Sequence, residues 1–324
     1  MSSRTLKEHF RKEIEAVRLA VHDLQSGWPS GLKLSTNPRP SIFDCYPYFF
    51  LDAFPGIRAA DVASLNVALH LLANSIFLYD KLMDPTRVGV EQADAAFGVQ
   101  FMQLECYDRL FALFPPRSPF WSRFRQQMAR YAQACLLEAQ FARGERPWAE
   151  FTRPVAFEIA TGKSAMTAVV IAGLAELAGD DRCYERLVAA LDRFDIAVQL
   201  WDDLQDWQDD LDSGMPSLLL VRMLGERPQP QRGADRDQLR RRIAAALYRG
   251  EHGTWLLTTI RETVGESLAL LDPLPLPRWR EVVAEFLEQC EALARHLGLG
   301  ERCWRDGLEN RGAAAAAPET LACA

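Results

Sequence analysis

Apolar residues recur with helical spacing along almost the whole chain. The strongest segment, residues 61–82, is apolar on nearly every face and predicts a long buried helix that ends before Pro85. No run with the two-residue period of a strand stands out, so the pattern predicts an all-α protein built around a central helical bundle. Further helices are predicted at 92–114, 119–142, 182–212, 237–249, 252–271 and 277–297, with one or two more in 154–178 around a break at Gly162.

The chain shows no composition shift that would mark a domain boundary. Residues 1–310 are therefore predicted to form a single all-α domain. Clusters of proline, glycine and charged residues predict loops at 143–154 and 226–238. The alanine-rich end of the chain, residues 311–324, is predicted to be a disordered tail.

Composition narrows the class of protein. Of the 324 residues, 48% are hydrophobic and 25% charged, as in soluble globular proteins, and the net charge of −7 argues against nucleic acid as a partner. Seven dispersed cysteines without a C-x-x-C pair predict reduced thiols and a cytoplasmic protein. No stretch approaches about 18 uninterrupted apolar residues, so no transmembrane helix is expected.

The most informative segment lies between Phe194 and Val221, which holds seven aspartates and no lysine or arginine. Asp202, Asp206 and Asp210 recur every four residues, which places them on one face of a helix. Like charges at this spacing repel, and carboxylate oxygens are hard ligands that suit Mg²⁺. The segment is therefore a candidate metal site, although a solvated acidic face is the plainer alternative.

A second acidic pair, Asp80 and Asp84, ends the long apolar helix. Each pair taken alone could simply face water, but two such pairs at the ends of apolar helices favour a clamp for magnesium and a diphosphate. Lys163 has apolar and small neighbours, so it is either a surface lysine or the partner of an anion such as a phosphate. Arg87 is either an ordinary loop arginine or a group that reaches the same anion.

Other chemistries find little support in the sequence. The five histidines show no H-x-x-x-H or E-x-x-H pairing, which argues against zinc protease and di-iron carboxylate sites. Neither a G-x-G-x-x-G nor a G-x-x-x-x-G-K-[ST] loop is present for a nucleotide. The sequence also lacks the G-x-S-x-G elbow of a hydrolase.

The segment Q-L-W-D-D-L-Q-D at 199–206 resembles the second aspartate-rich motif, Q-x-x-D-D-x-x-D, of the trans-isoprenyl diphosphate synthase and class I terpene synthase superfamily. The segment from Asp80 to Asp84 is similar to the first motif, D-D-x-x-D, with Lys81 in place of its second aspartate. The segment T-G-K-S at 161–164 resembles the diphosphate-binding lysine segment of the family.

This resemblance implies the isoprenoid synthase fold, with an active site in the central bundle, a prenyl diphosphate substrate and about three Mg²⁺ ions. It also suggests a homodimer. Phe77 and Trp201 could stabilise an allylic cation through their ring faces or could simply pack in the core. The resemblance assigns metal binding and catalysis to Asp80, Asp84, Asp202, Asp203 and Asp206, and substrate binding to Lys163, Arg87 and Gln199. Phe77 and Trp201 are further candidates for substrate binding because each lies within one helical turn of one of these aspartates.

One departure from the family pattern bears on the reaction. Chain-elongating members carry glutamine or histidine seven residues before the first aspartate, where this chain has Ala73. We therefore expect a terpene synthase, a lyase that ionises one prenyl diphosphate and releases a cyclised or rearranged terpene and pyrophosphate. Ser75 and Ile76, which are not bulky aromatics, permit a C15 or a C20 substrate. The alternatives are a chain-elongating synthase that uses isopentenyl diphosphate and a non-catalytic regulatory subunit of a prenyl synthase.

Overall fold

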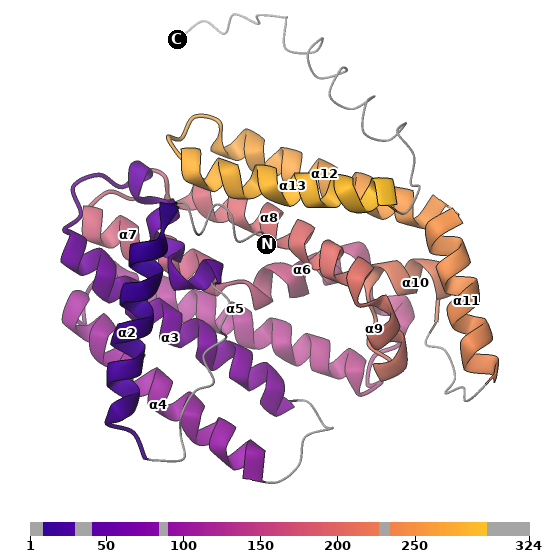
Figure 1. Cartoon of the computed structure of the whole chain (residues 1–324), viewed down its shortest axis with the longest axis horizontal. Helices are drawn as coiled ribbons and strands as arrows, with labels where there is room; N and C mark the ends of the chain where they lie inside the picture. Colours follow the sequence, from indigo (N-terminus) through magenta and orange to yellow (C-terminus); the bar gives the residue numbers. More distant parts are fainter. Residues whose placement is uncertain (1–8, 30–40, 84–89, 227–233, 250, 297–324) are drawn as a thin grey trace, which may run out of the picture. The chain divides into compact units, whose positions relative to one another are not determined.

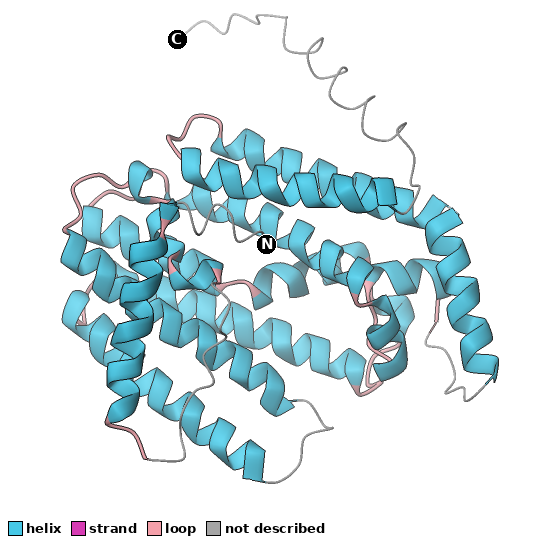
Figure 2. Cartoon of the chain, viewed as in Figure 1, coloured by secondary structure: helices cyan, strands magenta, loops and turns pink. Residues whose placement is uncertain are grey.

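The computed structural model describes residues 9–29, 41–83, 90–226, 234–249 and 251–296. Within these ranges every regular element is helical, which confirms the predicted all-α class (Figure 2). Four short 3₁₀ helices lie at Ile42–Asp44 (η1), Tyr46–Phe49 (η2), Leu51–Ala53 (η3) and Trp148–Glu150 (η4). The α-helices labelled in Figure 1 are α2 (Arg11–Ser26), α3 (Ala59–Met83), α4 (Val90–Leu113), α5 (Pro119–Ala142), α6 (Arg153–Lys163), α7 (Met166–Ala178), α8 (Tyr184–Gln205), α9 (Trp207–Ser213), α10 (Leu218–Leu224), α11 (Ala234–Arg249), α12 (Glu251–Leu271) and α13 (Pro277–His296).

Helix ends follow the proline and glycine signals in the sequence. Helix α5 begins at Pro119, because a proline at the first helical position removes an N–H that would have no partner in the helix. Helices α7 and α9 stop at Gly179 and Gly214, whose φ angles of 63° and 73° lie in the left-handed region that favours glycine. These signals explain why most predicted boundaries agree with the structure within a few residues.

One prediction of local structure is wrong, and two predicted boundaries are displaced by a few residues. The acidic stretch expected as one helix over 182–212 is two helices, α8 and α9, separated at Asp206 (φ −101°, ψ 9°). The break expected at Gly162 falls after Lys163, between α6 and α7, which are bent by 51°. The loop expected over 226–238 gives way to helix at Ala234, where α11 begins with acidic residues in its first turn.

The chain separates into two compact units. Unit 1 takes its described residues from Met1–Glu138, Phe157–Asp195 and Gly265–Glu285, and unit 2 from Ala139–Ala156, Ile196–Val264 and Phe286–Ala324. The prediction of one domain over residues 1–310 remains a prediction, and the expected tail at 311–324 lies outside the described residues.

Helix α3 is the central helix of unit 1 and packs against α2, α4 and α7. From Val62 to Ile76 nearly every residue is buried, as its all-round apolar sequence predicts. By length and composition its segment Ala59–Tyr79 could also cross a membrane, as could the bent pair α6 and α7 taken as one broken span. Because 61% of the apolar window in α3 is buried within the structure, this finding is equally that of a core helix.

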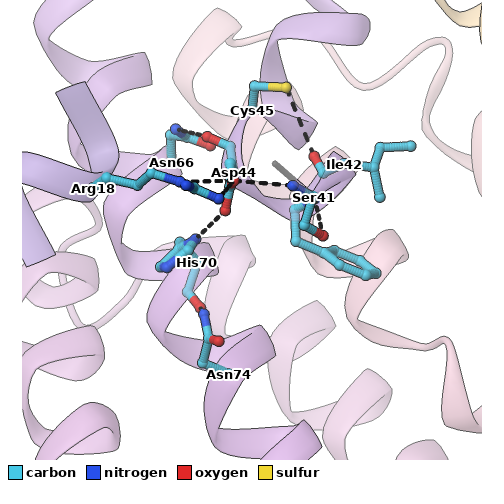
Figure 3. Close-up of polar contacts among 9 residues, drawn as sticks. Arg18, Ser41, Ile42, Asp44, Cys45, Asn66, His70 and Asn74 are labelled. Carbon is cyan, nitrogen blue, oxygen red and sulfur yellow. Dashed lines mark hydrogen bonds and ion pairs between the residues drawn. The ribbon is translucent and has the colours of Figure 1, made fainter. Parts of the chain in front are cut away.

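A buried carboxylate joins three elements of unit 1 (Figure 3). Asp44, in η1, is 3% exposed, and its Oδ2 accepts hydrogen bonds from Arg18 Nη2 in α2 at 2.9 Å and from the backbone N–H of Ser41 at 3.0 Å. His70 Nδ1, in α3, lies 3.2 Å from Asp44 Oδ1, and Asn66 Nδ2 donates to the Asp44 carbonyl oxygen at 2.8 Å. Asp44 therefore ties η1 to both α2 and α3.

Gly162 allows α6 to approach α5 closely within unit 1. A Cβ atom added to Gly162 would lie 2.4 Å from the Cβ of Ala134 and 3.1 Å from the carbonyl oxygen of Arg130. Both obstacles are short or rigid, since one is an alanine methyl and the other is backbone. The glycine therefore serves helix packing and does not end the helix.

Replacing Gly162 with alanine is expected to destabilise the protein by about 1–3 kcal/mol, because α5 and α6 would have to move apart. Urea denaturation followed by circular dichroism measures the loss. Gly98→Ala in α4 is the matched control, since its added Cβ would meet only the flexible tip of Leu78 at 3.3 Å. The control should be neutral or slightly stabilising, as alanine favours helix by about 1 kcal/mol over glycine. Equal stability of the two variants would contradict the close contact.

Candidate functional site

Two carboxylates of unit 2 are exposed at the junction between α8 and α9. Asp202 lies in the last turn of α8, and Asp206 is the residue between the two helices. The Asp206 N–H donates to the Asp202 carbonyl oxygen at 2.8 Å, so the helical spacing between the two residues survives the break. Asp206 is the N-cap of α9, but its side chain makes no capping hydrogen bond, although aspartate commonly does so at this position. Its carboxylate is thus not used to cap α9.

Asp203 lies about 100° around α8 from Asp202, on the buried side of the helix, and is 6% exposed. Its Oδ1 accepts a hydrogen bond from Gln199 Nε2 at 3.0 Å, and its Oδ2 accepts one from the Leu218 N–H at 3.2 Å. Leu218 is the first residue of α10, whose N-terminus favours a negative charge. In unit 2, Asp203 and Gln199 therefore fix the end of α8 against the start of α10, while Asp202 and Asp206 face outward.

The donor chemistry of this junction fits a divalent cation such as Mg²⁺. Two exposed carboxylates one helical turn apart supply hard oxygen ligands, and a cation between them would relieve their repulsion, which costs a few tenths of a kcal/mol. Among the side chains that the structure describes, no group of three acidic, histidine or cysteine residues is close enough to hold a metal ion. The predicted metal ligands, including Asp203, therefore remain predictions.

The first acidic pair belongs to unit 1. Asp80 lies on α3, three residues before the helix ends, and its side chain is outside the described part of the structure. Asp84 and Arg87 fall outside the described residues. Phe77, one turn before Asp80, is 44% exposed and makes an edge-to-face contact with Phe43 at 5.3 Å between ring centroids. A ring this exposed does not pack in the core, and its predicted contact with an allylic cation remains a prediction.

The structure describes the side-chain contacts or the burial of the other predicted site residues. Lys163 ends α6, and its ammonium group contacts the Glu138 carboxylate of α5 at 2.9 and 3.0 Å within unit 1. Trp201, in unit 2, is half-buried and makes an edge-to-face contact with Phe286 at 6.1 Å. Ala73 and Ser75 are fully buried in α3 and Ile76 is 6% exposed, so the small side chains at these positions belong to the interior of unit 1.

Asp195 is a partly buried carboxyl group of unit 1 that the sequence motifs do not include. Its Oδ2 lies 3.1 Å from Thr167 Oγ1, and Asp192, one turn earlier on α8, pairs with Arg130 Nη2 at 2.9 Å. Burial raises the pKa of Asp195 well above its ordinary value and the charge of Asp192 adds to this, while Thr167 and Arg130 oppose it. Burial likewise raises the pKa of Tyr46, which also feels the Asp195 charge. The available signal was an aspartate placed between Phe194 and Ile196.

Asp195→Asn is expected to stabilise the protein at neutral pH. A folded-state pKa above the unfolded value of 3.8 means that stability falls as pH rises from 3.8 through the raised pKa, and above it the full penalty applies. Asparagine removes that penalty, with a gain of about 0.5–2 kcal/mol as the usual scale for such replacements. Melting temperatures at neutral pH and below about pH 4 measure it, and the gain should vanish in acid. The exposed Asp52→Asn is the control. A loss of stability at neutral pH would contradict the raised pKa of the Asp195 carboxyl group.

Comparisons with known proteins agree with the helical architecture. No protein-family model matches the sequence, and a search of curated proteins found no significant match. Solved structures do match over most of both chains. A polyprenyl synthase from Caulobacter crescentus CB15, complexed with calcium and isoprenyl diphosphate, has a TM-score of 0.64 at 16% identity, covering 89% of this chain and 96% of that one.

Two further structures give the same result. A polyprenyl synthase from Roseobacter denitrificans has a TM-score of 0.65 at 15% identity, with coverage of 88% and 97%. A geranylgeranyl pyrophosphate synthase from Lactobacillus brevis ATCC 367 has a TM-score of 0.63 at 16% identity, with coverage of 91% and 100%. At this level of identity the likeness establishes the fold. The chain therefore has the all-α isoprenoid synthase fold of the superfamily that its aspartate-rich motif resembles.

Proposed function

We propose that this protein is a divalent-metal-dependent enzyme that acts on an allylic prenyl diphosphate. The observation that carries the proposal is the pair of exposed carboxylates, Asp202 and Asp206, at the end of α8 in a chain with the isoprenoid synthase fold. One structure with this fold binds calcium together with isoprenyl diphosphate. The buried free thiols of Cys45, Cys106 and Cys290 fit the reducing compartment predicted from the sequence.

Two reactions are compatible with these groups, and chain elongation is the better supported. The structures that share the fold are polyprenyl and geranylgeranyl diphosphate synthases, which favours a chain-elongating enzyme over the terpene synthase that we expected from the sequence. The first candidate is therefore a trans-prenyl diphosphate synthase that joins isopentenyl diphosphate to an allylic diphosphate.

Terpene synthesis remains the second candidate because of Ala73. This residue is fully buried in α3, and its methyl group can neither donate nor accept a hydrogen bond. By the resemblance, elongating enzymes hold their second diphosphate with glutamine or histidine at this position. A chain that cannot do so would ionise one diphosphate and release a cyclised or rearranged C15 or C20 product.

Either reaction assigns the same roles to the residues of each unit. A bound divalent cation supplies charge neutralisation for the diphosphate leaving group. In unit 2, Asp202 and Asp206 bind the cation through their carboxylate oxygens, and Asp203 and Gln199 hold this end of α8 in place. In unit 1, Lys163 donates charge-assisted hydrogen bonds to an anionic oxygen. The roles predicted for Asp80, Asp84 and Arg87 belong to the same scheme.

The test is product analysis with the purified full chain. The protein is incubated with Mg²⁺ and farnesyl or geranylgeranyl diphosphate, with and without isopentenyl diphosphate, and the extracts are analysed by gas chromatography–mass spectrometry. Longer prenyl diphosphates that form only with isopentenyl diphosphate support elongation. A hydrocarbon or alcohol formed without it supports the terpene synthase. No pyrophosphate release from any prenyl substrate would reject both and favour the non-catalytic subunit.

A further inference from the structure

Lys163 is the expected anion-binding lysine, yet a carboxylate of the same chain already lies against it. Its Nζ is 3.0 Å from Glu138 Oε1 and 2.9 Å from Glu138 Oε2, so both oxygens are within hydrogen-bond distance. The Lys163 side chain is 28% exposed and the Glu138 side chain 26% exposed, so solvent can reach the pair. The contact with Glu138 therefore orders the ammonium group of Lys163 but leaves it accessible to solvent.

The backbone of two helices sets this pairing. Gly162, next to Lys163, lets α6 approach α5 at Ala134, and Glu138 follows Ala134 by one turn on the same face of α5. One turn in the other direction, Arg130 pairs with Asp192. The Glu138 carboxylate is therefore positioned by packing that does not depend on the ion pair itself.

The ion pair between Lys163 and Glu138 is weak enough for a diphosphate to replace Glu138. Partly exposed ion pairs contribute about 0–1 kcal/mol, because solvent screens them and ordering the side chains costs entropy. A diphosphate carries several negative charges and more acceptor oxygens than one carboxylate, so it is the stronger partner for an ammonium group. A weak internal partner can hold the lysine in place and then give way to such a ligand.

We propose that Glu138 is the internal counter-anion of the Lys163 site, which competes with the diphosphate for the ammonium group and so sets its affinity. This inference rests on the proposed function and assigns Glu138 as a positioning and affinity-determining residue. Glu138 keeps Lys163 extended at the end of α6 when no diphosphate is bound. Diphosphate binding breaks the contact between Lys163 and Glu138.

The experiment measures the binding of inorganic pyrophosphate to the full chain, in the presence of Mg²⁺, by isothermal titration calorimetry. Glu138→Gln keeps the side-chain volume and removes the charge, and its dissociation constant for pyrophosphate should fall about 2- to 5-fold below that of the unchanged protein. The exposed Glu185→Gln makes the same change in net charge and should leave the constant unaltered. In a Lys163→Met background, Glu138→Gln should have no effect.

Several outcomes would overturn the inference. Unchanged or weaker pyrophosphate binding in Glu138→Gln would mean that Glu138 only orients the lysine, and no pyrophosphate binding in any variant would reject the site. If Glu138→Gln does not fold, Glu138→Asp replaces it, because its shorter side chain should loosen the contact and also tighten binding. Prenyl diphosphate turnover is measured separately. Lys163-dependent pyrophosphate binding without turnover rejects the proposed function alone, and turnover without the Glu138 effect rejects this inference alone.

Discussion

Asp202→Asn is expected to lower the rate of pyrophosphate release from a prenyl diphosphate by about 10²–10³-fold, the scale on which losing one transition-state contact acts. The substitution keeps the shape of an exposed side chain at the end of α8 and replaces a charged ligand for a divalent cation with a neutral amide. Steady-state turnover at several Mg²⁺ concentrations measures it. The apparent Mg²⁺ affinity should fall as well, which separates a ligand from a residue that only shapes the helix.

The control for this experiment lies in the same acidic segment. Asp209→Asn removes one exposed carboxylate from α9, so it changes the net charge equally. It should retain nearly full turnover, because Asp209 does not belong to the predicted motif. Full activity in Asp202→Asn, or equal losses in both variants, would contradict a metal site at the junction between α8 and α9.

The largest expected loss of stability comes from Asp44→Ala. Removing one partner of a buried ionic network typically costs about 3–5 kcal/mol, because the remaining charges and polar groups stay buried without it. Here the loss leaves Arg18, His70 and the Ser41 N–H without their shared carboxylate and removes the side-chain contacts that join η1 to α2 and α3. Urea denaturation measures the change in the free energy of unfolding.

The same variant should show a defined pH dependence. Burial alone would raise the pKa of Asp44, but His70, the Ser41 backbone and Arg18 outweigh it and hold the pKa below its ordinary value of 3.8. The contribution of Asp44 to stability is therefore complete above pH 3.8 and is lost as pH falls through the lowered folded-state pKa. The difference between Asp44→Ala and the unchanged protein should shrink below about pH 4.

A surface pair provides the comparison for Asp44. Arg58 and Asp61 form an ion pair near the start of α3, with the arginine side chain 81% exposed. Asp61→Ala should cost about 1 kcal/mol or less, as exposed pairs do. Similar losses for Asp44→Ala and Asp61→Ala would contradict the assignment of Asp44 as a buried junction between helices.

The helices could be predicted because their signals are local. Apolar spacing fixed the extent of α3, and Pro119 and Gly179 marked boundaries that depend on a few neighbouring residues. The break at Asp206 had no such signal, since neither proline nor glycine interrupts the acidic helical pattern there. Gly162 did give a signal, but glycine permits close packing as well as a helix end, and only the position of Ala134 decides between them.

The sequence predicts which kinds of side chain form the candidate site, but not which of them are exposed or what they contact. Asp202 and Asp203 are adjacent in the sequence, yet one is exposed and the other accepts hydrogen bonds at the start of α10. That difference depends on α10, because Leu218, fifteen residues after Asp203, supplies the N–H that the carboxylate accepts. The motif does not include α10. Glu138 could not be identified because its contact with Lys163 spans 25 residues. Asp195 stands among apolar residues in the sequence, but its contact with Thr167 and its raised pKa depend on the fold.

The four-residue spacing of the contact residues on α5 limits which insertions and deletions this helix can accept. Arg130, Ala134 and Glu138 are separated by single helical turns and meet α8 and α6 at successive levels. Inserting or deleting one residue between them would turn every later side chain by about 100° and shift it by about 1.5 Å, so Glu138 would leave Lys163. A substitution along this helix alters the contacts of one side chain, whereas a change in the number of residues would disrupt all later contacts at once.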